Sequence, residues 1–111
     1  NWEEAEKLLT MALNRFAEIK AWKYVYHCLE DLVILRTRQE FFSEAVMLAS
    51  FTDKIREREG TVRPPRSQSY FDKAVKEATH SLSPIELSKV TSDANTIELE
   101  SLLNSLGVDV G

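Results

Sequence analysis

A pattern of side chains that occurs twice, 40 residues apart, is the strongest constraint on how this chain can fold. An aromatic residue, an alanine three places later and a leucine three places after that appear near the amino terminus and again in the middle of the chain. The matching positions are Trp2 and Phe42, Glu4 and Glu44, Ala5 and Ala45, and Leu8 and Leu48. Recurrence at such an offset is typical of stacked helical units that bury their apolar faces against one another. The pattern therefore predicts an all-α fold of antiparallel helical hairpins.

Apolar residues spaced three and four apart predict about six helices. The expected ranges are 2–19, 20–38, 41–59, 67–80, 84–92 and a last helix from residue 95 or 96 to 107. The first helix should bury the face made by Trp2, Ala5, Leu9, Ala12, Phe16 and Ile19, which is widened by Leu8 and Leu13. The second is apolar around most of its circumference, so it should lie centrally, with only a strip of Lys23, His27, Glu30 and Asp31 in water. This arrangement gives Ile34 no clear position.

Glycine, proline and serine residues mark several helix ends. Gly60 and Gly107 should end the third and last helices in the left-handed conformation, with Val108 folding back on the last turn. Pro64-Pro65 predicts a loop over 61–66, and Ser83-Pro84-Ile85-Glu86 has the pattern of a capping box. We therefore expect a helical-repeat segment over 1–60, followed by a linker and capping helices over 61–111 that cover the open end of the last repeat.

Composition and charge exclude several classes of protein. The uninterrupted apolar run 32–35 has four residues and no run has more than five, which is too short to cross a membrane. Cys28 is the only cysteine, so we expect no internal disulfide and a reducing, cytoplasmic location. The net charge of −4 argues against a general nucleic-acid binder, although 54–66 carries five basic and two acidic residues. Because the sequence begins at Asn1 without methionine, we expect it to be part of a longer protein.

The repeat resembles the tetratricopeptide repeat, whose second helix likewise begins with an aromatic residue and has a small residue three places later. The spacing of 40 exceeds the usual 34, and Gln39-Glu40 stands where a glycine normally precedes the aromatic. The order of segments 28–32, 42–48, 55–60, 63–65, 70–74 and 95–99 is similar to the carboxy-terminal end of the repeat array in large bacterial signalling-ATPase transcriptional regulators. The resemblance implies a segment that docks a partner, with the ATPase and DNA-binding residues elsewhere in the parent protein.

No arrangement of residues in the sequence predicts catalysis, a cofactor or a metal. His27 and His80 lie 53 positions apart, and the glycines are scattered, so neither a metal motif nor a phosphate-binding loop is present. Cys28 lies on an apolar face with no cation placed to activate it, which favours a buried structural thiol. The acidic runs fit solvated helix surfaces better than general acid–base catalysis. We therefore expect a protein that is not an enzyme.

A protein-interaction scaffold is the function that these features favour. Its partner would be a protein, a peptide or another domain of the parent chain, and the candidate binding residues are Trp22, Tyr24, Lys54, Arg56, Arg58, Arg63 and Arg66. Aromatic residues at helical spacing are more often core, and cations at a helix end suit its dipole without any partner. The alternative is contact with nucleic acid or an acidic partner through 54–66. The first helix could also support self-association through Trp2, Leu9 and Phe16, because the end of a repeat stack exposes apolar surface.

Overall fold

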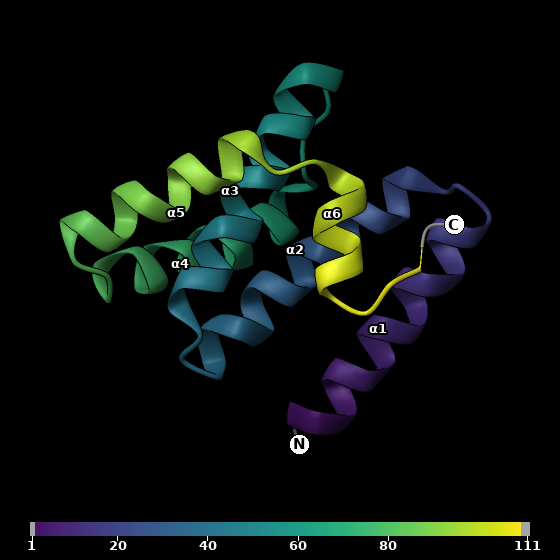
Figure 1. Ribbon diagram of the computed structural model, residues 1–111, viewed down its shortest axis with the longest axis horizontal. Coiled ribbons are helices and arrows are strands. Elements are labelled where there is room, and N and C mark those ends of the chain that lie inside the picture. The colour runs from purple at the N-terminus through teal and green to yellow at the C-terminus, as the bar shows by residue number, and fades with distance from the viewer. Residues whose placement is uncertain (1, 110–111) are drawn as a thin grey trace.

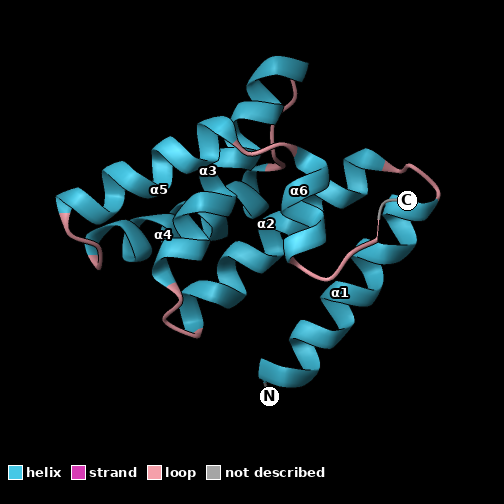
Figure 2. Cartoon of the chain, in the orientation of Figure 1, coloured by secondary structure: helices cyan, strands magenta, loops and turns pink. Residues whose placement is uncertain are grey.

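The computed structural model describes residues 2–109, and all regular structure in that range is helical (Figures 1 and 2). The helices are α1 (Trp2–Glu18), α2 (Trp22–Arg38), α3 (Phe42–Glu59), α4 (Pro65–His80), α5 (Pro84–Thr96) and α6 (Leu99–Ser105). The prediction of an all-α chain with about six helices is therefore confirmed for the described residues.

The first three helices end in the same way, at intervals of 20 residues. In each turn one residue has positive φ: 57° at Lys20, 65° at Glu40 and 68° at Gly60. The following amide then donates to a carbonyl five residues earlier: Ala21 to Phe16 at 2.8 Å, Phe41 to Arg36 at 2.9 Å and Thr61 to Arg56 at 2.9 Å. These are Schellman motifs, which satisfy carbonyls that a helix end leaves unpaired. The 40-residue recurrence thus consists of two 20-residue steps of helix plus turn.

The later helix boundaries differ from expectation in two places. α4 begins at Pro65, because proline is well suited to the first helical position, while Pro64 is extended as expected. α5 continues to Thr96, so the predicted end of this helix at residue 92 is wrong, as is the predicted start of the last helix at residue 95 or 96. Ala94 is buried, so packing rather than local preference keeps that stretch helical. The capping box of Ser83 and Glu86 and the left-handed Gly60 and Gly107 are confirmed.

α2 is the central helix, as its apolar circumference predicts. It packs against α1, α3 and α4, and α3 packs in turn against α4 and α5. Val25, Leu29 and Val33 of α2 are completely buried. In α1, by contrast, the deepest residues are Leu13 and Ala17, whereas Trp2 and Ile19 are exposed because they lie at the ends of the helix. Ala5, Leu9, Ala12 and Phe16 of the predicted face do pack against the core, whereas Leu8, which was expected to widen that face, is 59% exposed.

The last helix lies apart from α4 and α5, which pack on α2 and α3. α6 lies over the centre of the molecule, between α3 and α1 in the view of Figure 1. Leu102, Leu103 and Val108 are buried in the same core cluster as Leu13 of α1. The chain then returns to α1, where the Asp109 amide donates to Asn14 Oδ1 at 3.4 Å. α4 and α5 pack on α2 and α3, whereas the apolar side of α6 belongs to the core cluster that includes Leu13. The expectation that the final helices cap a last repeat stays a prediction.

Candidate functional site

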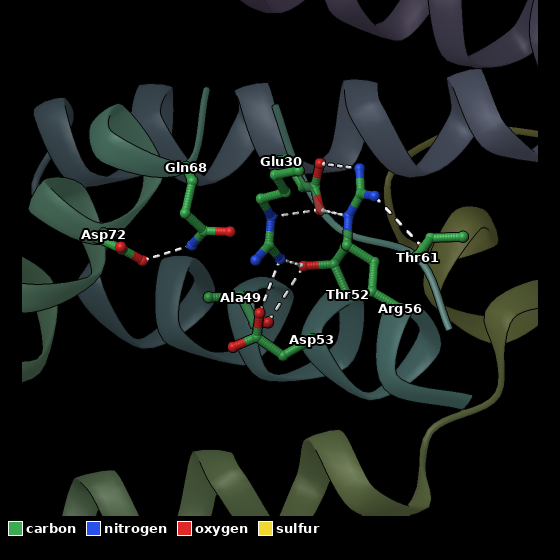
Figure 3. A network of polar contacts seen from close by, with 9 residues as sticks. Glu30, Ala49, Thr52, Asp53, Arg56, Thr61, Gln68 and Asp72 are labelled. Atoms are coloured by element: carbon green, nitrogen blue, oxygen red, sulfur yellow. Dashed lines mark hydrogen bonds and ion pairs between the residues drawn. The ribbon is translucent and has the colours of Figure 1, made fainter. Parts of the chain in front are cut away.

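A buried carboxylate in α2 forms ion pairs with two arginines from other parts of the chain (Figure 3). Glu30 is only 5% exposed. Arg56 of α3 binds both of its oxygens, with Nε 2.5 Å from Oε2 and Nη2 2.8 Å from Oε1, and Arg63 Nε lies 2.6 Å from Oε2. The hydrogen bonds that Arg56 donates to Glu30 raise the pKa of Arg56. The prediction that Glu30 lies in a solvated strip is therefore wrong. Its partners are distant in the sequence, and helical periodicity does not predict contacts between distant residues.

Arg63 extends this network toward α3 and α4. Its Nη2 atom lies 2.8 Å from Asp53 Oδ1 and donates to Thr52 Oγ1 at 3.3 Å. The guanidinium also lies 3.6 Å from the centre of the Phe71 ring, within the range of a cation–π interaction. The network therefore fixes the segment after Gly60 against both neighbouring helices. Gln68 and Asp72, also drawn in Figure 3, form a separate exposed pair at 2.7 Å.

The structure divides the basic segment 54–66 between the interior and the surface. Arg56 and Arg63 neutralise Glu30 and are largely buried, so they are committed to the fold. Lys54 is exposed and donates to Asn95 Oδ1 at 2.7 Å. Arg58 and Arg66 are exposed and make no ion pair with the described residues. Of the five predicted cations, three are thus on the surface, and Lys54 and Arg58 line a groove of about 510 Å³ between α3 and α5.

A third arginine, Arg36, joins the first three helices. Arg36 Nη2 lies 2.8 Å from Glu6 Oε1, and its Nη1 donates to Gln39 at 2.6 Å. Its Nε is 3.1 Å from Glu44 Oε1, an ion pair without hydrogen-bond geometry. Burial by itself lowers the pKa of Arg36, but the hydrogen bond to Glu6 and the charge of Glu44 raise it overall. The same hydrogen bond lowers the pKa of Glu6.

Trp22 and Tyr24 lie together at the start of α2, on the turn from α1. Trp22 is 36% exposed and Tyr24 is 54% exposed, while the Tyr24 ring stacks on Phe16 with centroids 5.2 Å apart. One face of Tyr24 is therefore used within the fold. The rise of an α-helix is about 1.5 Å per residue, so Trp22 and Tyr24 are far from Ile34 along α2. These two aromatics therefore do not belong to the surface around Ile34.

A groove between α2 and α4, which we call the α2–α4 groove, is the feature that sequence reasoning missed. Two adjoining depressions of about 80 and 270 Å³ open along it, and Ile34 and Tyr70 line both. Ile34, which had no place in the helical pattern, is half-buried there, and Tyr70 is 54% exposed. The only sequence signal for this groove was that Ile34 falls outside the apolar face of α2. That signal did not identify α4 as the other wall of the groove.

Charged side chains lie toward both ends of the α2–α4 groove. Arg38, Lys73 and Glu77 border its larger depression, and neither Arg38 nor Lys73 has an ion-pair partner within residues 2–109. His27 and Asp31 border the smaller depression, with Nε2 3.7 Å from Oδ2. Burial, followed by the nearby charge of Glu30, raises the pKa of Asp31 against the opposing effect of His27. The groove therefore combines an apolar centre with unpaired cations at one end.

Residues 2–109 contain no group of three or more histidine, cysteine or acidic side chains placed to hold a metal ion. None of the helices in this range combines the length and apolar character needed to cross a lipid bilayer. No protein-family model, curated protein or solved structure matches the chain. The function proposed below therefore rests on the chain's own geometry.

Proposed function

We propose that this chain is a protein-interaction module that binds a peptide segment in the α2–α4 groove. The segment would belong to a partner protein or to another domain of a longer parent chain. The observation that carries the proposal is the exposed Tyr70 beside half-buried Ile34, with Arg38 and Lys73 unpaired at one end. An apolar contact with a few placed charges is the usual composition of a binding site, because apolar area supplies affinity and charges fix orientation.

The arrangement of the helices supports a role as one end of a repeat array. α2 lies beside α4, and α3 lies beside α5, as the corresponding helices of successive hairpins do in a stacked repeat. Together with the tetratricopeptide-like spacing, this favours the terminal part of an array in a larger signalling or transcriptional regulator. Such a regulator would work in the cytoplasm, where a buried free thiol such as Cys28 is stable.

Selection of random peptides displayed on phage tests the groove directly. Peptides enriched on the wild-type chain should bind the Tyr70→Ala variant at least about tenfold more weakly, as expected for an aromatic residue at the centre of an interface. Tyr24→Ala is a matched control, since both tyrosines are 54% exposed. Both variants should keep the wild-type circular dichroism spectrum. If Tyr24→Ala alone weakens the selected peptides, the site lies at the α1–α2 turn; if neither does, the groove is not the binding site.

The second candidate function is contact with an acidic partner through the basic segment 54–66. The observation in its favour is that Lys54 and Arg58 line one groove, between α3 and α5, while Arg66 is exposed nearby in sequence. The commitment of Arg56 and Arg63 to Glu30 weakens it. Binding to a nucleic acid should fall steeply with salt concentration, whereas peptide binding in the α2–α4 groove should change much less. A titration of single-stranded oligonucleotides at rising salt separates the two.

A further inference from the structure

The side of α1 that faces away from the core presents a narrow apolar stripe. Glu4, Leu8, Met11 and Arg15 follow one another at intervals of four, three and four residues, so they lie on one face of the helix. Leu8 is 59% exposed and Met11 is 55% exposed, and Arg15 is exposed without an ion-pair partner in residues 2–109. We call this face the outer stripe of α1. The sequence predicted self-association through other residues of this helix. Two of them, Leu9 and Phe16, are half-buried against the core.

The internal repeat allows the outer stripe of α1 to be compared with the equivalent face of α3. Forty residues later, the positions of Leu8, Met11 and Arg15 hold Leu48, Phe51 and Ile55, all of which are buried in α3. Phe51 and Ile55 line the junction with α5, where Ala94 and Ile97 lie opposite them. In its second occurrence this face is therefore covered by a helix. In α1 no helix among residues 2–109 covers it, because Leu8 and Met11 are exposed.

We propose that the outer stripe of α1 is a dimer interface that takes the same stripe of a second copy of this chain, with the two helices antiparallel. The charge pattern selects this occupant. When two such helices are related by a two-fold axis midway between Leu8 and Met11, each Leu8 contacts Met11 of the other copy. Each Glu4 then faces Arg15 of the other copy, so opposite charges meet at both ends of the stripe. A parallel pairing places like charges together instead.

The interface is small, so the dimer is weak. One helix pair with two apolar residues from each copy buries less surface than the roughly 1,000 Å² of a stable interface. A dissociation constant on the order of 100 μM follows from comparison with weak, transient complexes. Sedimentation velocity from about 10 μM to 1 mM spans that range and should show the average mass rising with concentration.

Substitution of the stripe tests which surface forms the dimer. Leu8→Glu should weaken dimerisation at least about tenfold, because it places two carboxylates in the apolar centre of the interface. Val62→Glu is the matched control, since Val62 is 86% exposed and lies outside α1, and it should leave the mass distribution unchanged. Both variants should retain the helical circular dichroism of the wild type. Unchanged association of Leu8→Glu, or a wild-type chain that is monomeric at about 1 mM, would overturn the proposal.

A charge reversal tests the antiparallel register. Glu4→Arg and Arg15→Glu should each dimerise more weakly than the wild type, since each faces like charges across the two-fold axis. An equimolar mixture of the two variants should recover association, because each copy then supplies the charge that the other lacks. Recovery shows antiparallel pairing in this register. Failure to recover, with both variants folded, would rule out this register and with it the proposed two-fold interface.

Discussion

At the scale of single residues, three successive turns use the left-handed conformation, but only one of them has glycine there. Lys20 and Glu40 adopt φ values of 57° and 65°, which place the Cβ atom close to the following carbonyl and cost on the order of 1 kcal/mol. The Schellman hydrogen bonds and the packing of the flanking helices must outweigh that cost. These two residues are therefore local weaknesses that the tertiary structure tolerates.

Glu40→Gly should stabilise the protein by about 0.5–1 kcal/mol. The backbone strain at positive φ that glycine removes is larger than the free energy by which glycine's extra backbone entropy stabilises the unfolded chain. Gly60→Ala should destabilise it by about 1 kcal/mol for the converse reason, although a Cβ at Gly60 meets no other atom. Urea denaturation followed by circular dichroism measures both. Glu57→Gly, within α3 at an exposed position, is the control and should cost about 1 kcal/mol. A loss of stability in Glu40→Gly would show that its side chain contributes more than its backbone costs.

Cys28 should be nearly inert toward thiol reagents in the folded protein. Burial, followed by the charge of Asp31, raises the pKa of its thiol to about 11 from 9.0. At about pH 8 this lowers the thiolate fraction roughly 100-fold, and only the thiolate reacts. Alkylation at that pH should therefore be at least about 100-fold slower in the native protein than in urea-unfolded protein. Comparable rates in the two states would mean that α2 opens readily at this position.

At the scale of elements, helix packing is reinforced by arginines that bridge segments. Glu30 joins α2 to α3 through Arg56 and to the loop before α4 through Arg63, while Arg36 joins α1, α2 and α3. Buried ion pairs add little net stability over an apolar core, but removal of one partner leaves a buried charge uncompensated. Their effect is to specify which helix packs against which.

Glu30→Gln should destabilise the protein by about 3 kcal/mol, because Arg56 and Arg63 both lose their buried counter-charge and Arg63 keeps only the exposed Asp53. Asp31→Asn, at the adjacent and half-exposed position, should change stability by no more than about 0.5 kcal/mol. Equilibrium unfolding in urea at neutral pH compares the two. A cost below about 1 kcal/mol for Glu30→Gln would indicate that water replaces the carboxylate around both arginines.

At the scale of the whole molecule, one core includes residues from both ends of the chain. Leu13 near the amino terminus and Leu102, Leu103 and Val108 near the carboxy terminus belong to the same buried cluster. A helix as short as α6 is not stable by itself in water, so packing must hold it in place. The final segment is consequently part of the core, rather than a detachable cover.

Leu103→Ala should therefore cost about 2–5 kcal/mol, as for a central core leucine, and unfolding should remain a single transition. Leu29→Ala in α2 provides the reference, and Leu106→Ala, which is half-buried, should cost clearly less. Circular dichroism and tryptophan fluorescence should report the same midpoint for each variant. A cost below about 1 kcal/mol for Leu103→Ala would show that α6 detaches without loss of the core.

The sequence by itself determined what depends on neighbours along the chain. The helices, the central place of α2, the left-handed glycines and the Ser83–Glu86 capping box all follow from residues no more than a few positions apart. Of the candidate binding residues, the sequence identified exposed side chains such as Tyr24 and Arg58, but it also included Arg56 and Arg63, which the fold uses internally.

Only the tertiary structure decided the burial of Glu30, the course of α6 and the α2–α4 groove. Each depends on contacts between distant residues: Arg56 and Arg63 lie 26 and 33 positions from Glu30, and Asp109 lies 95 from Asn14. Helical periodicity specifies which side chains share a face, but the partner of that face is chosen when the helices pack. Ile34 and Tyr70 form one groove because α2 and α4 pack together, and no spacing within either helix specifies that pairing.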